Sequence, residues 1–359
     1  MTEAAPGWDP AAFRARVQAA LDGFLDEQAV RLAPLGDDAA RLLAEARAIV
    51  SGGKRFRAAF CYWGFHAVAG PSDVDDDALV RACASLELLH ASALVHDDYM
   101  DASDTRRGRP ATHRGFAAEH RGDGWRGDPE QYGASAAILL GDLLLSWSDE
   151  LLRRCGLPLE RVVAALDVFD RCRSEVITGQ FLDVSVQARG VADVDAAMTV
   201  LRYKSAKYSI ERPLHIGGTL AGADEAGLAE LSAFGLPLGE AFQLRDDLLG
   251  VFGDPSTTGK PAGDDLVEGK RTVLVALALD AAPADEAARL DAALGSDLSP
   301  AEVAELRRII DASGAHHQVE QVIGELVARA TTALQRADLD ERARGVLGQL
   351  ATAATDRVV

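Results

Sequence analysis

The stretch ASLELLHASALVHDDYMD at residues 84–101 decides the fold class of this chain. Its apolar residues recur at the spacing of an α-helix, and it ends in the acidic string HDDYMD. Because successive helix residues are rotated by about 100°, Asp97 and Asp101 lie one turn apart on the same face. We therefore expect a helix over 76–101 whose polar end presents a pair of carboxylates.

Helical spacing extends over most of the remaining sequence. Ala, Leu, Glu and Arg, which are strong helix formers, are abundant, and no stretch alternates apolar and polar residues as a β-strand does. The breaks are rich in Gly, Pro and Asp but too short for interdomain linkers. We expect an all-α protein with a single domain over 1–359. Its further helices are predicted over 11–33, 38–50, 133–154, 159–187, 193–205, 225–250, 271–280, 301–311 and 316–336.

The composition excludes several classes of protein. The chain has 359 residues and a formal net charge of −19, which argues against a nucleic acid or an anionic membrane surface as the main partner. Its four cysteines form no CxxC pair, which favours a reducing compartment over a zinc or disulfide framework. No apolar run reaches the roughly 18 residues of a membrane span, and the N-terminus lacks a signal-peptide pattern. We expect a cytoplasmic protein without stable membrane insertion.

A second acidic string, FQLRDDLLG at 242–250, also ends an apolar helical segment. Like charges one turn apart destabilise a helix unless a cation lies between them. Carboxylate oxygens suit Mg²⁺, which usually also binds substrate phosphate. One such string has the alternative of a solvated helix end, but two strings in matching positions make that alternative weaker. The pair predicts two acidic helix ends that face each other across one cavity and hold several cations.

Basic motifs lie close to the acidic strings in the sequence. Only five of the 37 basic residues are lysines, and four of these fall in such motifs. Cations beside paired carboxylates in an acidic protein indicate a polyanionic substrate that is bridged by metal. The motifs are GGKRFR at 52–57, TRRGRP at 105–110, YKS at 203–205, GK at 259–260 and GKRT at 269–272.

These strings together resemble the trans-isoprenyl diphosphate synthase (polyprenyl synthetase) family, and among its members the bacterial geranylgeranyl diphosphate synthases most. The matching strings, in order over 52–272, are GGKRFR, HDDYMDASDTRRGRP, LGDLLL, GQFLD, YKSAKY, FQLRDDLLGVFGD, TGKPAGDD and EGKRT. The resemblance implies the isoprenoid synthase fold, with antiparallel helices around a central cavity, and a homodimer. It also implies head-to-tail condensation of isopentenyl diphosphate with an allylic diphosphate and release of pyrophosphate.

The resemblance assigns roles to particular residues. About three Mg²⁺ ions, replaceable by Mn²⁺, would bind the allylic diphosphate through Asp97 and Asp101 on one side and Asp246 on the other. Asp98 and Asp247 would support these ligands. The allylic diphosphate would be held by Arg106, Lys204, Lys260, Gln243 and Lys270. Isopentenyl diphosphate would be held by Lys54, Arg57, His90 and Arg107.

Two positions depart from the family pattern. Ser205 replaces the commoner threonine but keeps the hydroxyl. Gly250 stands where the second acidic motif of the family has its last aspartate. A water molecule, Asp247 or Asp254 could fill the place of the missing carboxylate.

The helix before Asp97 predicts the length of the product. Ser92 and Ala93, about one turn back, are small, whereas Leu89 and Leu86 lie deeper. This order predicts geranylgeranyl diphosphate, with farnesyl or longer diphosphates as alternatives. A class I terpene cyclase would need a different second metal motif, and a non-catalytic prenyltransferase subunit would not need both acidic strings.

Overall fold

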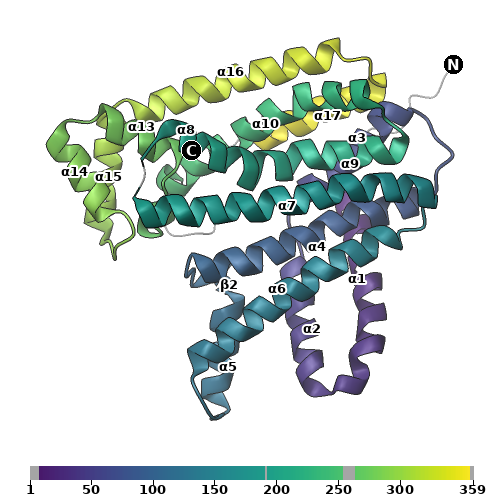
Figure 1. Ribbon diagram of the computed structural model, residues 1–359, viewed down its shortest axis with the longest axis horizontal. Helices are drawn as coiled ribbons and strands as arrows, with labels where there is room; N and C mark the ends of the chain where they lie inside the picture. Colours follow the sequence, from purple (N-terminus) through teal and green to yellow (C-terminus); the bar gives the residue numbers. More distant parts are fainter. Residues whose placement is uncertain (1–7, 191, 254–262, 356–359) are drawn as a thin grey trace.

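The computed structural model describes residues 8–190, 192–253 and 263–355 (Figure 1). Within these ranges the chain is helical apart from short connections and one antiparallel pair of two-residue strands, β1 (Thr105–Arg106) and β2 (Arg109–Pro110). The prediction of an all-α protein is therefore confirmed.

Each predicted helical segment coincides with a helix. The first half contains α1 (Pro10–Leu32), α2 (Asp37–Val50), α3 (Phe56–Ala69), α4 (Asp76–Met100), α5 (Thr112–Gly122), α6 (Pro129–Arg153) and α7 (Leu159–Arg189), with a 3₁₀ turn at Ala33–Leu35. The second half contains α8 (Val194–Val200), a π-helix (Leu201–Glu211), α9 (Arg212–Ala221), α10 (Glu225–Phe252), α12 (Asp264–Val267), α13 (Val273–Ala281), α14 (Ala284–Ala293), α15 (Pro300–Ala312), α16 (Ala315–Arg336) and α17 (Glu341–Thr355).

The sequence does not predict α3, α5, α9, α12, α14 or α17. Helices α3 and α9 pack against each other and are buried on most sides, so their apolar residues form no single stripe. The segment expected as one helix over 193–205 is also different. It is α-helical only to Val200 and continues as a π-helix to Glu211.

Helices α4, α7 and α16 lie roughly along the long axis of the molecule, α6 runs obliquely to it, and α1, α2 and α5 project away (Figure 1). Helix α4 packs against α6, and the π-helix packs against α7 and α10. One core cluster contains buried residues of α3, α4, α6 and α9, and a second contains those of α10, α13, α15 and α16. Residues of both halves line the cavity described below.

Helix α4 begins at an acidic cap and ends at the first acidic string. The Asp75 side chain accepts hydrogen bonds from the N–H groups of Asp77 and Ala78, which are otherwise unpaired at a helix N-terminus. Among the described helices, α4 is long and apolar enough to cross a membrane, but 78% of its apolar window is buried inside the protein. This burial is typical of the core helix of a soluble protein.

Candidate active site

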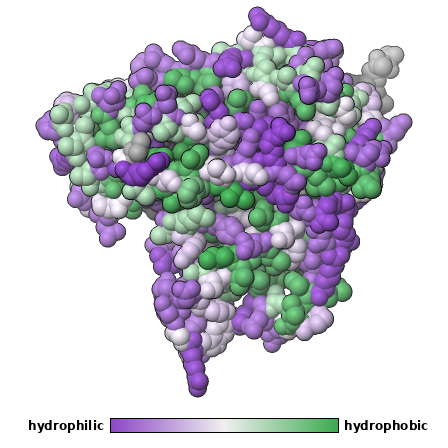
Figure 2. Space-filling view, viewed as in Figure 1, coloured by the Kyte–Doolittle hydropathy of each residue, from purple (hydrophilic) through white to green (hydrophobic). Residues whose placement is uncertain are grey.

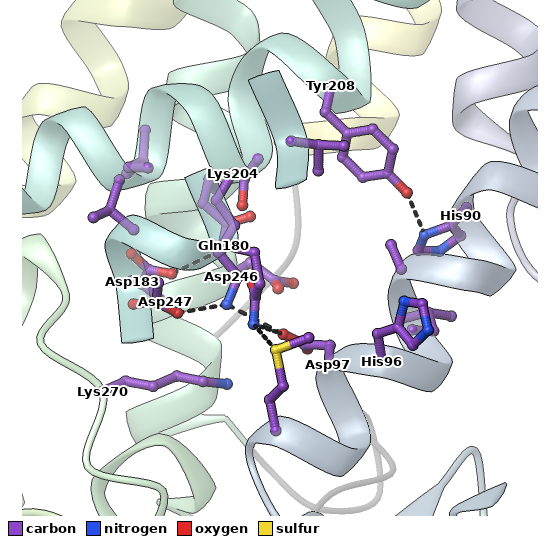
Figure 3. Close-up of a pocket in the computed structure, with 18 of the residues that line it drawn as sticks. His90, His96, Asp97, Gln180, Asp183, Lys204, Tyr208, Asp246, Asp247 and Lys270 are labelled. Atoms are coloured by element: carbon purple, nitrogen blue, oxygen red, sulfur yellow. Dashed lines mark hydrogen bonds and ion pairs between the residues drawn. The ribbon is translucent and has the colours of Figure 1, made fainter. Parts of the chain in front are cut away.

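A cavity of roughly 1380 Å³ lies between the two halves of the helical bundle. Asp97 near the end of α4 and Asp246 and Asp247 of α10 all line it, and they approach from opposite sides (Figure 3). The two acidic strings therefore meet across one cavity, as the sequence predicted. The wall along α4 above Asp97 includes Leu89, Ser92 and Ala93.

Asp97 is held by a polar side chain and a cation from other helices. Its Oδ1 accepts a hydrogen bond of 3.0 Å from Nε2 of Gln180 on α7 and lies 3.2 Å from Nζ of Lys204. Burial opposes ionisation, but the charges of Lys204, Lys270 and Arg106 outweigh it and hold the pKa of Asp97 at about 2. This carboxylate therefore stays ionised at neutral pH.

Asp101 lies one turn beyond Asp97, at the C-cap of α4. Its Oδ2 is 3.5 Å from Nζ of Lys270, although Asp101 does not itself line the cavity. Burial and the nearby charge of Asp97 raise the pKa of Asp101 to about 6. The pair thus concentrates negative charge at the end of α4, which favours binding of a cation there.

Asp98 points to a different neighbour. Its carboxylate accepts a 2.8 Å hydrogen bond from Nε of Arg106 and a second from Nη2, and Asp98 is almost fully buried. It is not among the residues that line the cavity. Asp98 therefore orients the guanidinium of Arg106, and Arg106 does line the cavity.

At the second acidic end, Asp247 is buried beside Asp246. Nε2 of Gln243 donates a 2.8 Å hydrogen bond to Oδ1 of Asp247. Burial and the charge of Asp265 raise the pKa of Asp247 to about 8. A cation at this end would offset that cost of ionisation.

The π-helix presents Lys204, Ser205 and Tyr208 to the cavity. It is tightly confined by α7, because a Cβ atom added to Gly179 would lie only 2.4 Å from the backbone nitrogen of Lys204. This approach also places Oδ2 of Asp183 2.5 Å from Nζ of Lys204. Burial opposes the charge of Lys204, but Asp97 and Asp183 outweigh it and raise its pKa above the usual value. π-helical segments occur frequently at functional sites.

The four residues expected to bind isopentenyl diphosphate all line the same cavity: Lys54, Arg57, His90 and Arg107. Arg57 lies over the ring of Tyr208, 4.3 Å from its centroid, and donates from Nη2 to Oγ of Ser209 at 2.8 Å. Nε of Arg57 is buried and has no hydrogen-bond partner among the described residues, so it retains a donor for a ligand. The adjacent Arg55 serves the structure instead, because it is buried against Glu87 at 3.1 Å.

His90 forms a hydrogen bond of 2.8 Å between its Nδ1 and the hydroxyl of Tyr208 (Figure 3). Burial and the nearby charges of Arg57 and Arg107 lower the pKa of His90 well below its usual value. The ring is therefore neutral at neutral pH and acts through hydrogen bonds rather than through charge.

Besides Asp98 and Asp101, one further described residue that the sequence placed at the site, Leu86, does not line the cavity. Leu86 is fully buried in the core and does not line the cavity, which corrects its expected place in the wall that limits the product. Lys260 lies outside the described residues, as does Asp254.

Several lining residues have no role in the sequence-based assignment: Gln180, Asp183, Tyr208 and Asp265. The first three lie within GQFLD and YKSAKY, two of the strings that resemble the family. Their polar side chains in these strings could have indicated that they belong to the site. Asp265 lies in TGKPAGDD, where nothing in the spacing relates it to the second acidic end.

The donor set fits a magnesium ion that shares its ligands with a phosphate. Among the described residues no three His, Cys, Asp or Glu side chains gather closely enough to form a metal site of their own. Mg²⁺ commonly uses one or two carboxylates together with substrate phosphate oxygens. Asp97 and Asp246, with the cations Lys204 and Lys270 beside them, provide such an incomplete set.

An all-α bundle whose cavity combines an apolar wall with two acidic helix ends and several cations suits a substrate that joins a diphosphate to a hydrocarbon tail. The sequence matches the Polyprenyl synthetase family over residues 40–312, and the chain belongs to this family. It is a prenyl diphosphate synthase, as the sequence predicted.

Similar proteins agree on the family but differ in product. A crystal structure of geranylgeranyl pyrophosphate synthase from Corynebacterium glutamicum, complexed with isoprenyl diphosphate and magnesium, is 41% identical with a TM-score of 0.95, covering 98% of this chain and 100% of that one. The geranylgeranyl diphosphate synthase of Mycobacterium tuberculosis is 35% identical over 79% of this chain and 75% of its own. The geranylfarnesyl diphosphate synthase of Natronomonas pharaonis is 30% identical over 79% and 76%.

Proposed function

We propose that this enzyme condenses isopentenyl diphosphate head to tail with dimethylallyl, geranyl and farnesyl diphosphates, and that its main product is geranylgeranyl diphosphate. The observation that carries the proposal is the meeting of Asp97 and Asp246 across one cavity whose wall continues as small and apolar side chains of α4. Charged groups at one end and an apolar wall beyond them suit a substrate with a diphosphate head and a hydrocarbon tail.

The allylic diphosphate binds between the two acidic ends. Asp97, Asp101 and Asp246 would hold about three Mg²⁺ ions, replaceable by Mn²⁺. When bound, these ions would supply positive charge against the charge that develops on the leaving pyrophosphate. Lys204, Arg106 and Lys270, with Gln243 and Lys260, donate hydrogen bonds to the diphosphate oxygens. Donors fixed before the reaction stabilise the leaving group without reorganisation, which is the main source of rate in such sites.

Isopentenyl diphosphate binds on the other side of the cavity mouth. Lys54, Arg57 and Arg107 supply positive charge, and the buried Nε of Arg57 supplies a donor. We assign the Tyr208 hydroxyl as the donor to Nδ1 of His90, so that the neutral ring carries its proton on Nε2 and donates it to the ligand. The apolar wall keeps water from the allylic carbocation, and the departing pyrophosphate accepts the final proton.

The wall along α4 limits the tail. Ala93, one turn before Asp97, and Leu89, two turns before it, both line the cavity. The small side chain of Ala93 leaves its part of the wall open to a long tail. These positions favour geranylgeranyl over farnesyl diphosphate.

Labelled isopentenyl diphosphate tests this product assignment. The purified enzyme is incubated with each of the three allylic primers, and the products are hydrolysed and separated by chromatography. We expect geranylgeraniol from every primer. Farnesol alone, or alcohols longer than geranylgeraniol as the main species, would overturn the assignment of product while leaving the family intact.

A second copy of this chain is the proposed partner. Helices α6 and α7 expose large apolar side chains, and Figure 2 shows hydrophobic residues gathered over this side of the molecule. Ile177 and Phe181 of α7 line the cavity yet are 55% and 68% exposed, so a partner on this face would also close the cavity wall. Exposed apolar patches of this kind mark interaction sites.

Light scattering distinguishes the dimer from the monomer. Leu139→Glu places a charge on the exposed face of α6 without touching the cavity lining, and we expect it to yield a monomer. The control is Val30→Glu, because Val30 is also exposed (78%, against 62% for Leu139) but lies on α1, outside the exposed face of α6 and α7. A monomeric wild-type protein would overturn the assignment.

We place the enzyme in the cytoplasm, which is supported by four cysteines that are all buried and free.

A further inference from the structure

At the second acidic end, the carboxylate of Asp265 packs directly against Gly250. A Cβ atom built on Gly250 would lie 1.9 Å from Oδ2 and 2.4 Å from Cγ of Asp265. The carboxylate of Asp265, which comes from α12, thus occupies the space where a side chain at position 250 would begin. Both residues line the cavity.

The backbone does not explain this glycine. Gly250 lies within α10 and is not among the glycines with a positive φ angle. A glycine inside a helix is unfavourable relative to alanine, so its presence requires another reason. The space that Asp265 fills supplies that reason, because any Cβ at position 250 would displace its carboxylate.

Asp265 is held where it can act on the same ligand as α10. Its Oδ1 lies 3.2 Å from Nζ of Lys270, and its backbone carbonyl accepts a 3.0 Å hydrogen bond from the N–H of the same residue. Asp246, Asp247 and Lys270 lie together on this side of the cavity (Figure 3).

We propose that Asp265 supplies the third carboxylate of the second metal-binding end, in place of the side chain absent at position 250, and that Gly250 is required to admit it. The proposal rests on the proposed function, in which metal ions bind a diphosphate at this end. It differs from the candidates considered from the sequence, because the carboxylate comes from α12 rather than from α10 or Asp254.

A structural role for Asp265 is the alternative, in which it only pairs with Lys270 and fixes α12. The two roles differ in how ligand binding depends on metal. Loss of a metal ligand weakens pyrophosphate binding only when Mg²⁺ is present. Loss of a pairing partner alters pyrophosphate binding with and without Mg²⁺, because it changes the position of Lys270 itself.

Calorimetric titration of inorganic pyrophosphate into the enzyme, with Mg²⁺ and with EDTA, separates these roles without any turnover. For Asp265→Asn we expect about tenfold or greater loss of affinity in Mg²⁺ and no loss in EDTA. Gly250→Ala should show the same pattern although it keeps every charge. Gly324→Ala is the matched control, because nothing lies within 4 Å of its added Cβ on α16, and it should bind as wild type does.

Moving the carboxylate gives the sharpest test. Gly250→Asp alone introduces a clash and should bind as poorly as Asp265→Asn. The double variant Gly250→Asp with Asp265→Gly returns the carboxylate to α10 and should recover most of the Mg²⁺-dependent affinity. Wild-type affinity in Asp265→Asn, or equal losses with and without Mg²⁺, would overturn the proposal.

The failure of this proposal is distinguishable from failure of the proposed function. If Asp97→Ala and Asp246→Ala abolish Mg²⁺-dependent pyrophosphate binding but Asp265→Asn does not, only the role of Asp265 is wrong. If none of the three variants changes the Mg²⁺-dependent binding, the metal-bridged diphosphate site itself is wrong.

Discussion

Nζ of Lys204 lies 3.2 Å from Oδ1 of Asp97, so one ion pair joins the π-helix to the first acidic end of α4. The same ammonium is 2.5 Å from Asp183 of α7. The ammonium of Lys204 thus connects the π-helix with α4 and α7. The backbone of the π-helix packs directly against Gly179 of α7, which fixes its position.

Replacing this ammonium by a guanidinium should impair the enzyme. Lys204→Arg keeps the charge but puts a larger planar group between two carboxylates, so we expect kcat/KM to fall about tenfold or more. Lys207→Arg is the control, because Lys207 lies outside the cavity and pairs with Glu175 at 3.4 Å. Equal tolerance of arginine at both positions in steady-state kinetics would contradict a specific need for lysine.

Removing a carboxylate from either acidic end should abolish most turnover. Asp97→Ala and Asp246→Ala each remove a proposed metal ligand, and we expect kcat to fall by about two orders of magnitude or more. Circular dichroism should show an unchanged helix content. Near-normal rates at saturating Mg²⁺ in either variant would show that the residue is not a ligand.

Product length should follow the wall of α4. Ala93→Phe fills the first turn before Asp97, so we expect farnesyl or geranyl diphosphate in place of geranylgeranyl diphosphate, with the first condensation retained. Leu89→Ala should allow longer products. Chromatography of the hydrolysed products measures both shifts.

Leu86→Ala is the matched control for Leu89→Ala. Leu86 is fully buried but does not line the cavity, so its truncation should cost about 2–5 kcal/mol of stability and leave the product unchanged. An active Ala93→Phe enzyme with the wild-type product distribution would show that the tail does not pass this face of α4.

The buried His215 should make stability depend on pH. Burial and the Arg212 guanidinium, whose Nη1 lies 2.9 Å from Nδ1, lower the pKa of His215 to about 4. In the unfolded chain the pKa is about 6.5, so between these values the unfolded state binds more protons. The contribution of His215 to the free energy of unfolding is thus complete above about pH 6.5 and declines as the pH falls toward 4.

Chemical denaturation at about pH 7.5 and about pH 5 measures this contribution. The wild-type free energy of unfolding should fall more between these pH values than that of His215→Gln, which cannot be protonated. Each unit of pKa difference corresponds to about 1.4 kcal/mol. Identical pH dependence in the two proteins would contradict a neutral buried His215.

The sequence predicts the features that repeat along a helix and misses those that depend on another element. The spacing of Asp97 and Asp101 and the apolar stretch before them are local, and so are the segments of α4, α7 and α10. Asp98 is next to Asp97 and therefore about 100° around the helix, but only the tertiary structure reveals that Arg106 lies there.

The contact between Gly250 and Asp265 cannot be predicted from local sequence. It joins residues of α10 and α12, and no periodicity relates them. The π-helix is similar, because its residues read as an ordinary helix until the close approaches of α7 and α10 are known. The prediction for Leu86 was wrong for a related reason. The helix was predicted correctly, but Leu86 faces the core and not the cavity.

The central claim is that one diphosphate is bound jointly by the two acidic ends. A crystal structure of the enzyme with Mn²⁺ and inorganic pyrophosphate, with the ions located by anomalous scattering, tests it directly. The account predicts ions that bridge pyrophosphate to Asp97 and Asp101 on one side and to Asp246 on the other, with Lys204 in contact with the phosphate oxygens. Pyrophosphate bound away from both ends, or ions at only one of them, would contradict it.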